Sequence, residues 1–180
     1  MLPILLYILM GIIQFGLIFA VYVTINNSVR EAARWGSIYV FDNTMSNTAN
    51  DTARNDGMVD RIYISRGILN IPVRGTAGSN FNTATTGTFA VASCPNQTVT
   101  APAVAAWYYG ANSANPDVTI CYAQPTSVPA SDPRRGYYLD VETWYHLQVF
   151  IPLLQQFLPD DPVKGAPWIR LPGRITVVIN

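Results

Sequence analysis

The sequence predicts an α+β protein in which a long N-terminal helix, apolar at first and amphipathic later, precedes a small antiparallel β-sheet domain with long loops. Three observations predict this class. An apolar run opens the chain, helical periodicity continues beyond it, and the last third alternates apolar and polar residues with the period of β-strands. We expect residues 1–41 to form the helix and residues 42–180 to form an extracellular globular domain that also holds a short second helix.

The composition restricts the class of protein. The chain has 180 residues with 11 basic and 11 acidic side chains, and only 12% of its residues are charged, against about 25% in an average soluble domain. A nucleic-acid-binding protein would need an excess of positive charge for the phosphates. Intrinsic disorder is excluded because 49% of the residues are hydrophobic. The low charge indicates a surface that largely meets something other than water.

The apolar run extends from Pro3 to Ile25, and no charged side chain precedes Arg30. About 20 apolar residues suffice for a helix to cross a bilayer. A cleaved secretory signal is the competing interpretation, but it would need a basic start, a shorter apolar core and a small-residue cleavage site. We therefore expect a retained helix. The positive-inside rule would place Arg30 and Arg34 in the cytoplasm, whereas the composition of the remaining chain indicates export, and we follow the composition.

The helix is expected to continue past the apolar run. No proline interrupts positions 4–41, which predicts one helix from Ile4 to Phe41, about 55 Å long. Arg30, Glu31 and Arg34 lie on one side of its second half, and Glu31 and Arg34 are spaced to pair. A narrow face of small residues lies on the other side and suits packing on a globular domain; it consists of Val29, Ala32, Ala33, Gly36 and Val40.

Three residues of the apolar half are candidates for helix packing. Gly11 and Gly16 are five residues apart, so they form no GxxxG motif, but they allow close approach of another helix. Gln14 lies at apolar depth, where an amide needs a hydrogen-bond partner from another helix. The alternative interpretation is that Gln14 is merely tolerated there.

The remaining chain predicts a small sheet domain. No charged residue occurs from Gly75 to Pro116, and this Thr-, Ala- and Asn-rich segment is typical of surface loops around one or two short strands. Such a surface could contact neighbouring copies or carry sugars. The expected elements are a helix at Asp56–Ile68, strands at Thr88–Ala92, Val118–Tyr122 and Leu139–Val149, a two-turn helix at Pro152–Leu158 and a final strand at Ile175–Ile179.

The chain has two cysteines, Cys94 and Cys121. In an exported domain a disulfide is favoured over a metal site, and the alternative is two buried thiols. A disulfide closing this loop would contribute about 3 kcal/mol to stability. The triplets Asn50-Asp51-Thr52 and Asn96-Gln97-Thr98 match the N-glycosylation pattern, which arises often by chance.

Catalysis is not expected. His146 is the only histidine and lies on the polar face of a predicted strand, where a structural role is favoured. The carboxylates Asp140 and Glu142, and the pair Asp160-Asp161, could be half-sites for acid–base chemistry or calcium, but we expect them to be solvated. The sequence carries no P-loop, dinucleotide fingerprint, HExxH or CxxC motif. We therefore predict no catalytic residue, cofactor or metal.

Several segments carry a resemblance to a known family. The start LPILL (Leu2–Leu6), the segment GIIQFG (Gly11–Gly16) and above all VREAARWG (Val29–Gly36) resemble the TadE-like pilin family of the tight-adherence (Tad) pilus, a branch of the type IV filament superfamily. The end of the chain is also similar, with a strand, the segment Phe150–Leu154 and a final strand. The resemblance covers about 40 N-terminal and about 45 C-terminal residues.

The chain departs from the family pattern near its start. Relatives are made with a short leader ending in glycine, and their mature helix usually carries an early glutamate. Here no acidic residue precedes Glu31, and Gln14 stands where relatives often have an acidic residue. Two interpretations follow: the sequence begins downstream of a processed start, or this member does without these features. A subunit without the early glutamate would rely on a neighbouring pilin of another type for it.

The resemblance implies a structural subunit with a type IV pilin-like fold. Its helix would lie in the inner membrane before assembly and in the core of an extracellular filament afterwards, serving surface adhesion. Gly11, Gln14, Gly16, Arg30, Glu31 and Arg34 would be the packing and assembly residues. Its partners would be copies of itself, other pilins and glycans. The alternatives are a membrane-anchored adhesin or receptor that never polymerises, with Trp107-Tyr108-Tyr109 stacking on sugar, and a minor pilin at a tip or priming complex.

Overall fold

The fold was obtained as a computed structural model, which describes residues 2–65, 67, 69, 88–90, 103–109, 117–125, 127–128 and 134–180. The chain is α+β, as predicted. Its elements are, in order, α1 (Leu2–Ser37), α2 (Asn47–Ile64), β1 (Thr88–Ala90), β2 (Ala103–Tyr109), β3 (Val118–Ala123), β4 (Tyr138–Gln148), α3 (Pro152–Gln155) and β5 (Trp168–Val178).

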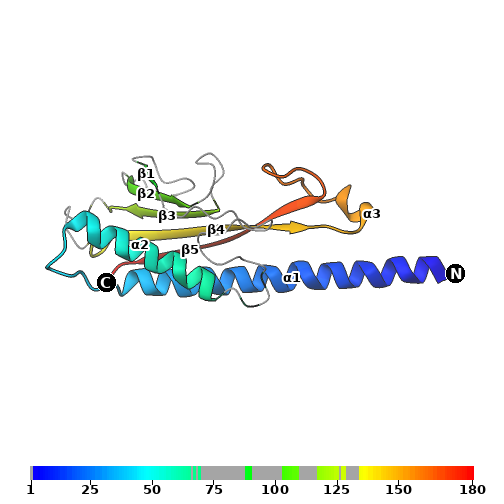
Figure 1. Ribbon diagram of the computed structural model, residues 1–180, viewed down its shortest axis with the longest axis horizontal. Helices are drawn as coiled ribbons and strands as arrows, with labels where there is room; N and C mark the ends of the chain where they lie inside the picture. The colour runs from blue at the N-terminus through cyan, green and yellow to red at the C-terminus, as the bar shows by residue number, and fades with distance from the viewer. Residues whose placement is uncertain are drawn as a thin grey trace.

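The described strands form one antiparallel sheet with the order β1-β2-β3-β4-β5. The longest pair is β4 with β5, whose register places Tyr145 opposite Leu171 and His146 opposite Arg170. These two strands form a long hairpin that carries α3 at its far end and runs along α1 (Figure 1). The free N-terminal end of α1 projects beyond this hairpin (Figure 1).

The hydrophobic core lies between one face of the sheet and the two long helices. Alternate residues of the strands supply the sheet side of the core, because successive side chains of a strand point to opposite faces. Small and branched residues of α1 and apolar residues of α2 supply the other side. The buried members include Ile25, Val29, Ala32, Ala33, Met58, Ile62, Ile120, Tyr122, Leu139 and Val141.

The long helix ends at Ser37, four residues before the predicted end at Phe41. The backbone N–H of Asn180 donates to the carbonyl of Ser37 (3.4 Å), so the end of α1 lies beside the segment that follows β5. Of the predicted small-residue face, Val29, Ala32, Ala33 and Gly36 are buried, whereas Val40 lies past the helix and is 83% exposed.

The second helix begins nine residues earlier than predicted and ends at Ile64 rather than Ile68. Ser46 caps its N-terminus by accepting a hydrogen bond from the N–H of Ala49 (3.2 Å), which satisfies one of the free amides of the first turn. The prediction from Asp56 was wrong because the first half of α2 has a polar sequence. Its buried residues there include Asn50, Arg54 and Asn55 rather than apolar side chains.

The strand predictions differ from the structure in extent. β3 and β4 lie within one residue of the predicted bounds, whereas β5 begins seven residues before the predicted Ile175. Pro172 and Gly173 lie inside β5, and both residue types weaken a sequence-based strand prediction. β2 was not predicted as a separate strand, and α3 has one turn instead of two.

The backbone of α1 approaches the sheet most closely at Gly173. A Cβ atom at this position would clash with the Cγ2 of Ile25, and it would lie 3.3 Å from the backbone carbonyl carbon of Ile25. Since the helix backbone cannot yield as a side-chain tip can, only glycine fits without moving α1. A second close contact occurs at Gly36. A Cβ atom added there would clash with the side chain of Met58 and lie 2.8 Å from the Cδ2 of Leu139.

This contact predicts the effect of two glycine substitutions. Gly173→Ala should lower the free energy of unfolding by about 1–3 kcal/mol, because overpacking displaces the helix. Gly16→Ala should leave it unchanged or raise it by up to about 1 kcal/mol, since a Cβ there meets nothing within 4 Å and alanine favours the helix. Denaturant unfolding of the full chain in detergent, followed by circular dichroism, measures both. Equal midpoints for the two variants would contradict the proposed close approach.

Candidate functional site

The most distinctive surface of the protein is the outward face of α1. One face of the helix is buried against the domain through Gln14, Val21, Ile25, Ser28, Val29, Ala32, Ala33 and Gly36. The opposite face is apolar and open: Leu5 is 70% exposed, Ile12 65% and Phe19 68%. Among the described residues, the segment Ile4–Ser37 is long and apolar enough to cross a membrane. Exposed apolar surface on this scale marks a site of membrane or protein interaction.

The charged residues of α1 continue this outward face. Arg30 follows Val23 by seven residues and Arg34 follows Arg30 by four, so all three lie on one side of the helix. The predicted assembly residues Arg30, Glu31 and Arg34 are all exposed. Within the described part of the chain, their side chains make no ion pair or hydrogen bond, although Glu31 and Arg34 are spaced to pair. Their charges are therefore open to a partner.

Gln14 was expected to find its hydrogen-bond partner on another helix, but one partner lies within its own chain. Its side chain is 3% exposed, and its Oε1 accepts a hydrogen bond from the backbone N–H of Phe150 (3.2 Å). The end of the β4–β5 hairpin is thereby fixed to the apolar half of α1. The Nε2 atom of Gln14 is buried and finds no acceptor among the described residues.

A groove opens beside Gln14, between α1 and the hairpin. It has a volume of about 230 Å³ and is lined by Met10, Ile13, Gln14, Leu17, Phe150 and Ile151. Gly11 and Gly16, the other predicted packing residues, lie on open helix surface with nothing within 4 Å of an added Cβ. The structure thus brings Gln14 into a contact within the chain and leaves both glycines available for contact with other molecules.

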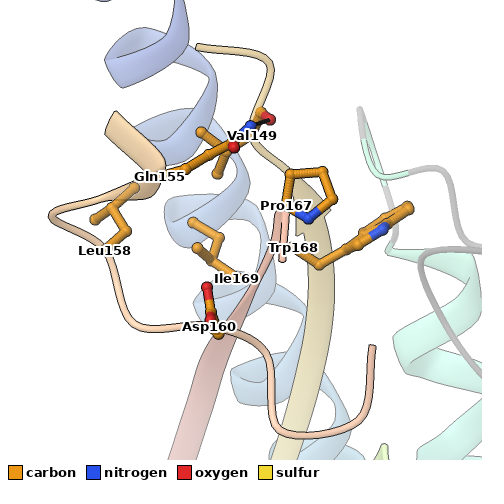
Figure 2. A pocket seen from close by; sticks show the side chains of 7 residues that line it. All are labelled: Val149, Gln155, Leu158, Asp160, Pro167, Trp168 and Ile169. Carbon is orange, nitrogen blue, oxygen red and sulfur yellow. Dashed lines mark hydrogen bonds between the residues drawn. The ribbon is translucent and has the colours of Figure 1, made fainter. Parts of the chain in front are cut away.

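A second hollow lies at the far end of the hairpin, around Val149 and Gln155 (Figure 2). The amide Nε2 of Gln155 donates to the carbonyl of Val149 (2.8 Å), which ties α3 to the end of β4. The lining residues are Val149, Gln155, Leu158, Asp160, Pro167, Trp168 and Ile169. The hollow has no room for a water-sized body, so it offers no ligand site.

Near the same end of the hairpin, a buried cluster surrounds His146. Nε2 of His146 lies 3.0 Å from Oδ1 of Asp117, and Nδ1 contacts Oδ2 of Asp161. All three side chains are fully buried. When both carboxylates are ionised they can only accept hydrogen bonds, so both ring nitrogens then donate and the ring is an imidazolium. The cluster fixes the loop after α3 to β4 and to the residue that precedes β3.

The pKa values in this cluster follow from burial and pairing. Burial lowers the pKa of His146, but the hydrogen bonds and charges of Asp117 and Asp161 outweigh it, so the net shift is upward. Burial raises the pKa of Asp161, yet hydrogen bonds from His146 and from the N–H groups of Val163 and Lys164 bring it below its ordinary value. Burial also lowers the pKa of the adjacent Arg170.

The expectation that the acidic residues are solvated was wrong for Asp140, Glu142 and Asp161, whereas Asp160 is exposed as expected. Asp140, Glu142 and Asp161 are exposed by 3%, 9% and 2%, and Asp140 receives a bidentate hydrogen bond from Arg174 (2.8 and 3.0 Å). The reason is cross-strand pairing, since β5 places its arginines on the face that carries the acidic residues of β4. The period-2 pattern placed Asp140, Glu142 and His146 on one face of the strand, but only the strand register shows which arginines lie opposite them.

A third buried polar cluster lies beneath α2 and was not predicted. Arg54 is fully buried, with its guanidinium 4.8 Å from the ring centroid of Phe41 and 5.8 Å from that of Tyr122. Arg134 pairs with Asp51 (2.6 Å). The hydroxyl of Tyr122 donates to Asn55 (2.5 Å), and burial raises the pKa of Tyr122 strongly. Both arginines are distant in sequence from these partners, so spacing gave no signal.

The structure tests the predicted disulfide and the predicted glycan sites only in part. Cys121 is buried in β3 and disulfide-bonded, whereas its predicted partner Cys94 lies outside the described residues. Asn50 is 1% exposed and hydrogen-bonds with its side chain to the backbone of Asp42, so its triplet is closed to a glycan in the folded protein. Asn96 and the side chains of Trp107-Tyr108-Tyr109 lie outside the described residues.

The His146 cluster predicts a pH dependence of stability. The raised pKa of His146 means that its pairing stabilises the fold fully below its unfolded pKa of about 6.5, and that this contribution is lost as the pH rises through the folded pKa. The free energy of unfolding should therefore fall from pH 6 towards pH 9, by at most about 1.4 kcal/mol per pH unit. Denaturant unfolding of the full chain in detergent at several pH values measures this fall.

His146→Gln is the matched variant, since glutamine can hydrogen-bond but does not titrate. It should be less stable at pH 6 and should lack the decline between pH 6 and 9. Burial also raises the pKa of Glu142, so this carboxyl makes its own contribution to the pH dependence of stability, which begins at lower pH than that of His146. Both proteins contain Glu142, so this contribution is the same in each. An identical pH profile for the two proteins would contradict the assigned role.

Comparison with known proteins adds one match. No curated protein and no solved structure matches the chain. Residues 1–34 match the sequence model of the family described as TadE-like protein, and this stretch contains most of the open face of α1, Gln14 and the three exposed charges. The match confirms the resemblance carried by the N-terminal segments. Together with the long apolar helix and the antiparallel sheet, it connects this chain to the TadE-like proteins and indicates a pilin-like protein associated with the Tad pilus.

Proposed function

We propose that this protein is a structural subunit that polymerises through α1 into an extracellular Tad-type filament that serves surface adhesion. The observation that carries the proposal is the division of α1 into two faces. The globular domain covers one face from Gln14 to Gly36, and the opposite face is exposed and apolar from Ile4 to Val23. A rod built in this way can bury its open face only against lipid or against other rods.

The middle of α1 supports a filament over a permanent membrane anchor. The sheet domain already lies against α1 at the level of Gln14, while Phe15, Phe19 and Tyr22 on other sides of the helix are still apolar and exposed. Apolar helix surface and globular domain therefore overlap along eight residues or more, about 12 Å of the axis. In a filament the domain would lie outside and the apolar face inside, so this overlap fits the filament without further change.

The charges at the end of the open face support contacts between copies. Arg30, Glu31 and Arg34 carry both signs and have no partner within the described part of their own chain. When many copies pack in parallel, Glu31 of one copy can meet an arginine of another. Such pairs help to set the register of the helices, because transfer from lipid to an apolar core gains little from the hydrophobic effect.

Before assembly, the same helix would hold the subunit in the inner membrane. The filament could also contain other pilins, since a neighbour of another type could supply acidic groups that the apolar half of this helix lacks. Catalysis, a cofactor and a metal play no part in the proposed role.

Reversal of the charge at Glu31 tests the proposed role of the α1 charges in assembly. Glu31→Lys should lower the yield of sheared surface filaments about tenfold, because it places three like charges on one helix face. Asp160→Lys, a reversal at an exposed acidic residue of the α3–β5 loop, should leave the yield within about twofold of the unchanged protein. Electron microscopy of sheared filaments and mass spectrometry of their protein measure both effects.

Two outcomes would count against the proposal. Equal yields from the two reversals would remove the assembly role of the α1 charges. A protein found only as dispersed subunits in the envelope, with no filament containing it, would favour the alternative of a non-polymerising anchored adhesin.

A further inference from the structure

The groove beside Gln14 and a row of aromatic residues lie on opposite flanks of α1. At about 100° per residue, the groove residues Met10, Ile13 and Leu17 centre on one flank. Phe15, Phe19 and Tyr22 centre about 170° further around the axis. We call this row the aromatic ridge. Its three side chains are 55%, 68% and 47% exposed.

We propose that the aromatic ridge of one copy of this chain fills the groove of the next copy, and that the Tyr22 hydroxyl accepts the free hydrogen bond of the Gln14 amide. This inference rests on the proposed filament and specifies its helix–helix contact. A contact between two different surfaces of the same molecule is head-to-tail, and its repetition gives a ring or an open helical filament.

The unmatched amide of Gln14 indicates what the occupant must offer. Gln14 is only 3% exposed. Its Oε1 already accepts a hydrogen bond from the Phe150 N–H, and its Nε2 lacks an acceptor among the described residues. A lipid chain could fill the apolar groove, but it has no acceptor for this N–H group. The occupant should therefore combine an apolar body with an oxygen atom.

A tyrosine has this combination, since its ring is apolar and its hydroxyl accepts and donates hydrogen bonds. Among the exposed large side chains of α1 from Ile4 to Val23, only Tyr7 and Tyr22 carry a hydroxyl. Tyr7 lies on the same side of the helix as Gln14, whereas Tyr22 lies on the flank away from the groove. Only Tyr22 can therefore reach the groove of a neighbour that repeats the same head-to-tail contact.

The contact fixes the axial shift between neighbouring copies. If Tyr22 of one helix lies level with Gln14 of the next, parallel helices are displaced by eight residues, about 12 Å along the axis. Met10 then lies level with Ile18 of the neighbour and next to its Phe19. Cysteines at positions 10 and 19 would come within the Cα separation of about 4.4–6.8 Å that a disulfide needs.

This geometry is tested by cross-linking in assembled filaments. The full chain carrying Met10→Cys and Phe19→Cys is produced in filament-forming cells, and sheared filaments are oxidised and separated by size without reductant. We expect a ladder of covalent multimers that collapses on reduction. The control with Met10→Cys and Ile12→Cys has the same number of cysteines, but the second lies about 9 Å from the required level, and it should give no ladder.

A second pair of variants tests the hydrogen bond and keeps every cysteine native. Tyr22→Phe removes only the hydroxyl and should lower filament yield about threefold to tenfold, the range for one interhelical hydrogen bond in an apolar environment. Tyr7→Phe removes a hydroxyl from the same helix and should have no effect. Adding Gln14→Leu to Tyr22→Phe should cause no loss beyond that of Gln14→Leu alone.

The outcomes separate this inference from the proposed function. Filaments that contain this chain but give no ladder, or give equal ladders from both cysteine pairs, overturn the groove-and-ridge contact and leave the filament proposal standing. Equal yields from Tyr22→Phe and Tyr7→Phe overturn the hydrogen bond between Tyr22 and Gln14. The absence of the unchanged chain from any filament overturns the proposed function itself.

Discussion

The close approach of α1 to the β4–β5 hairpin is the contact on which the remaining structure depends. Small residues on one face of the helix and Gly173 in β5 bring the helix backbone against the strand. This approach aligns the helix with the longest strands of the sheet and places its opposite face outward. Without it the domain would have no fixed position on the helix, and the two faces of α1 would not be defined.

The domain holds several charged side chains in its interior. His146 between two aspartates and Arg134 with Asp51 are paired inside the fold, and the buried Asp140 pairs with Arg174, which is partly exposed. A buried ion pair adds little net stability over an apolar contact, but the loss of one partner leaves an uncompensated charge and is costly. The clusters therefore favour one arrangement of hairpin, loop and helix over its competitors.

The exposed part of α1 has the opposite character. The outward side of its apolar half exposes large apolar side chains. Its exposed charges find no partner within the described residues of the same chain. The exposed apolar surface is unfavourable for an isolated molecule in water, whereas the hydrated charges are tolerated there and can pair when copies pack together. Because lipid and a filament core are similarly apolar, polar groups such as the Gln14 amide and the α1 charges are the features that could distinguish the two environments.

The long helix, the β3 and β4 strands and the resemblance of the N-terminal segment to the TadE-like proteins could be predicted from local periodicity and a continuous motif. The sequence also identified Gln14 as unusual, since an amide in an apolar run is visible without any structure. The partner of Gln14 could not be predicted in this way, because Phe150 is 136 residues away and only the folded chain brings the two together. The tertiary structure also decided that Asp140, Glu142 and Asp161 are buried, and that α2 begins at a polar segment. Those outcomes depend on strand register and on pairs of residues distant in sequence, and no local pattern records which charges a fold will bring together.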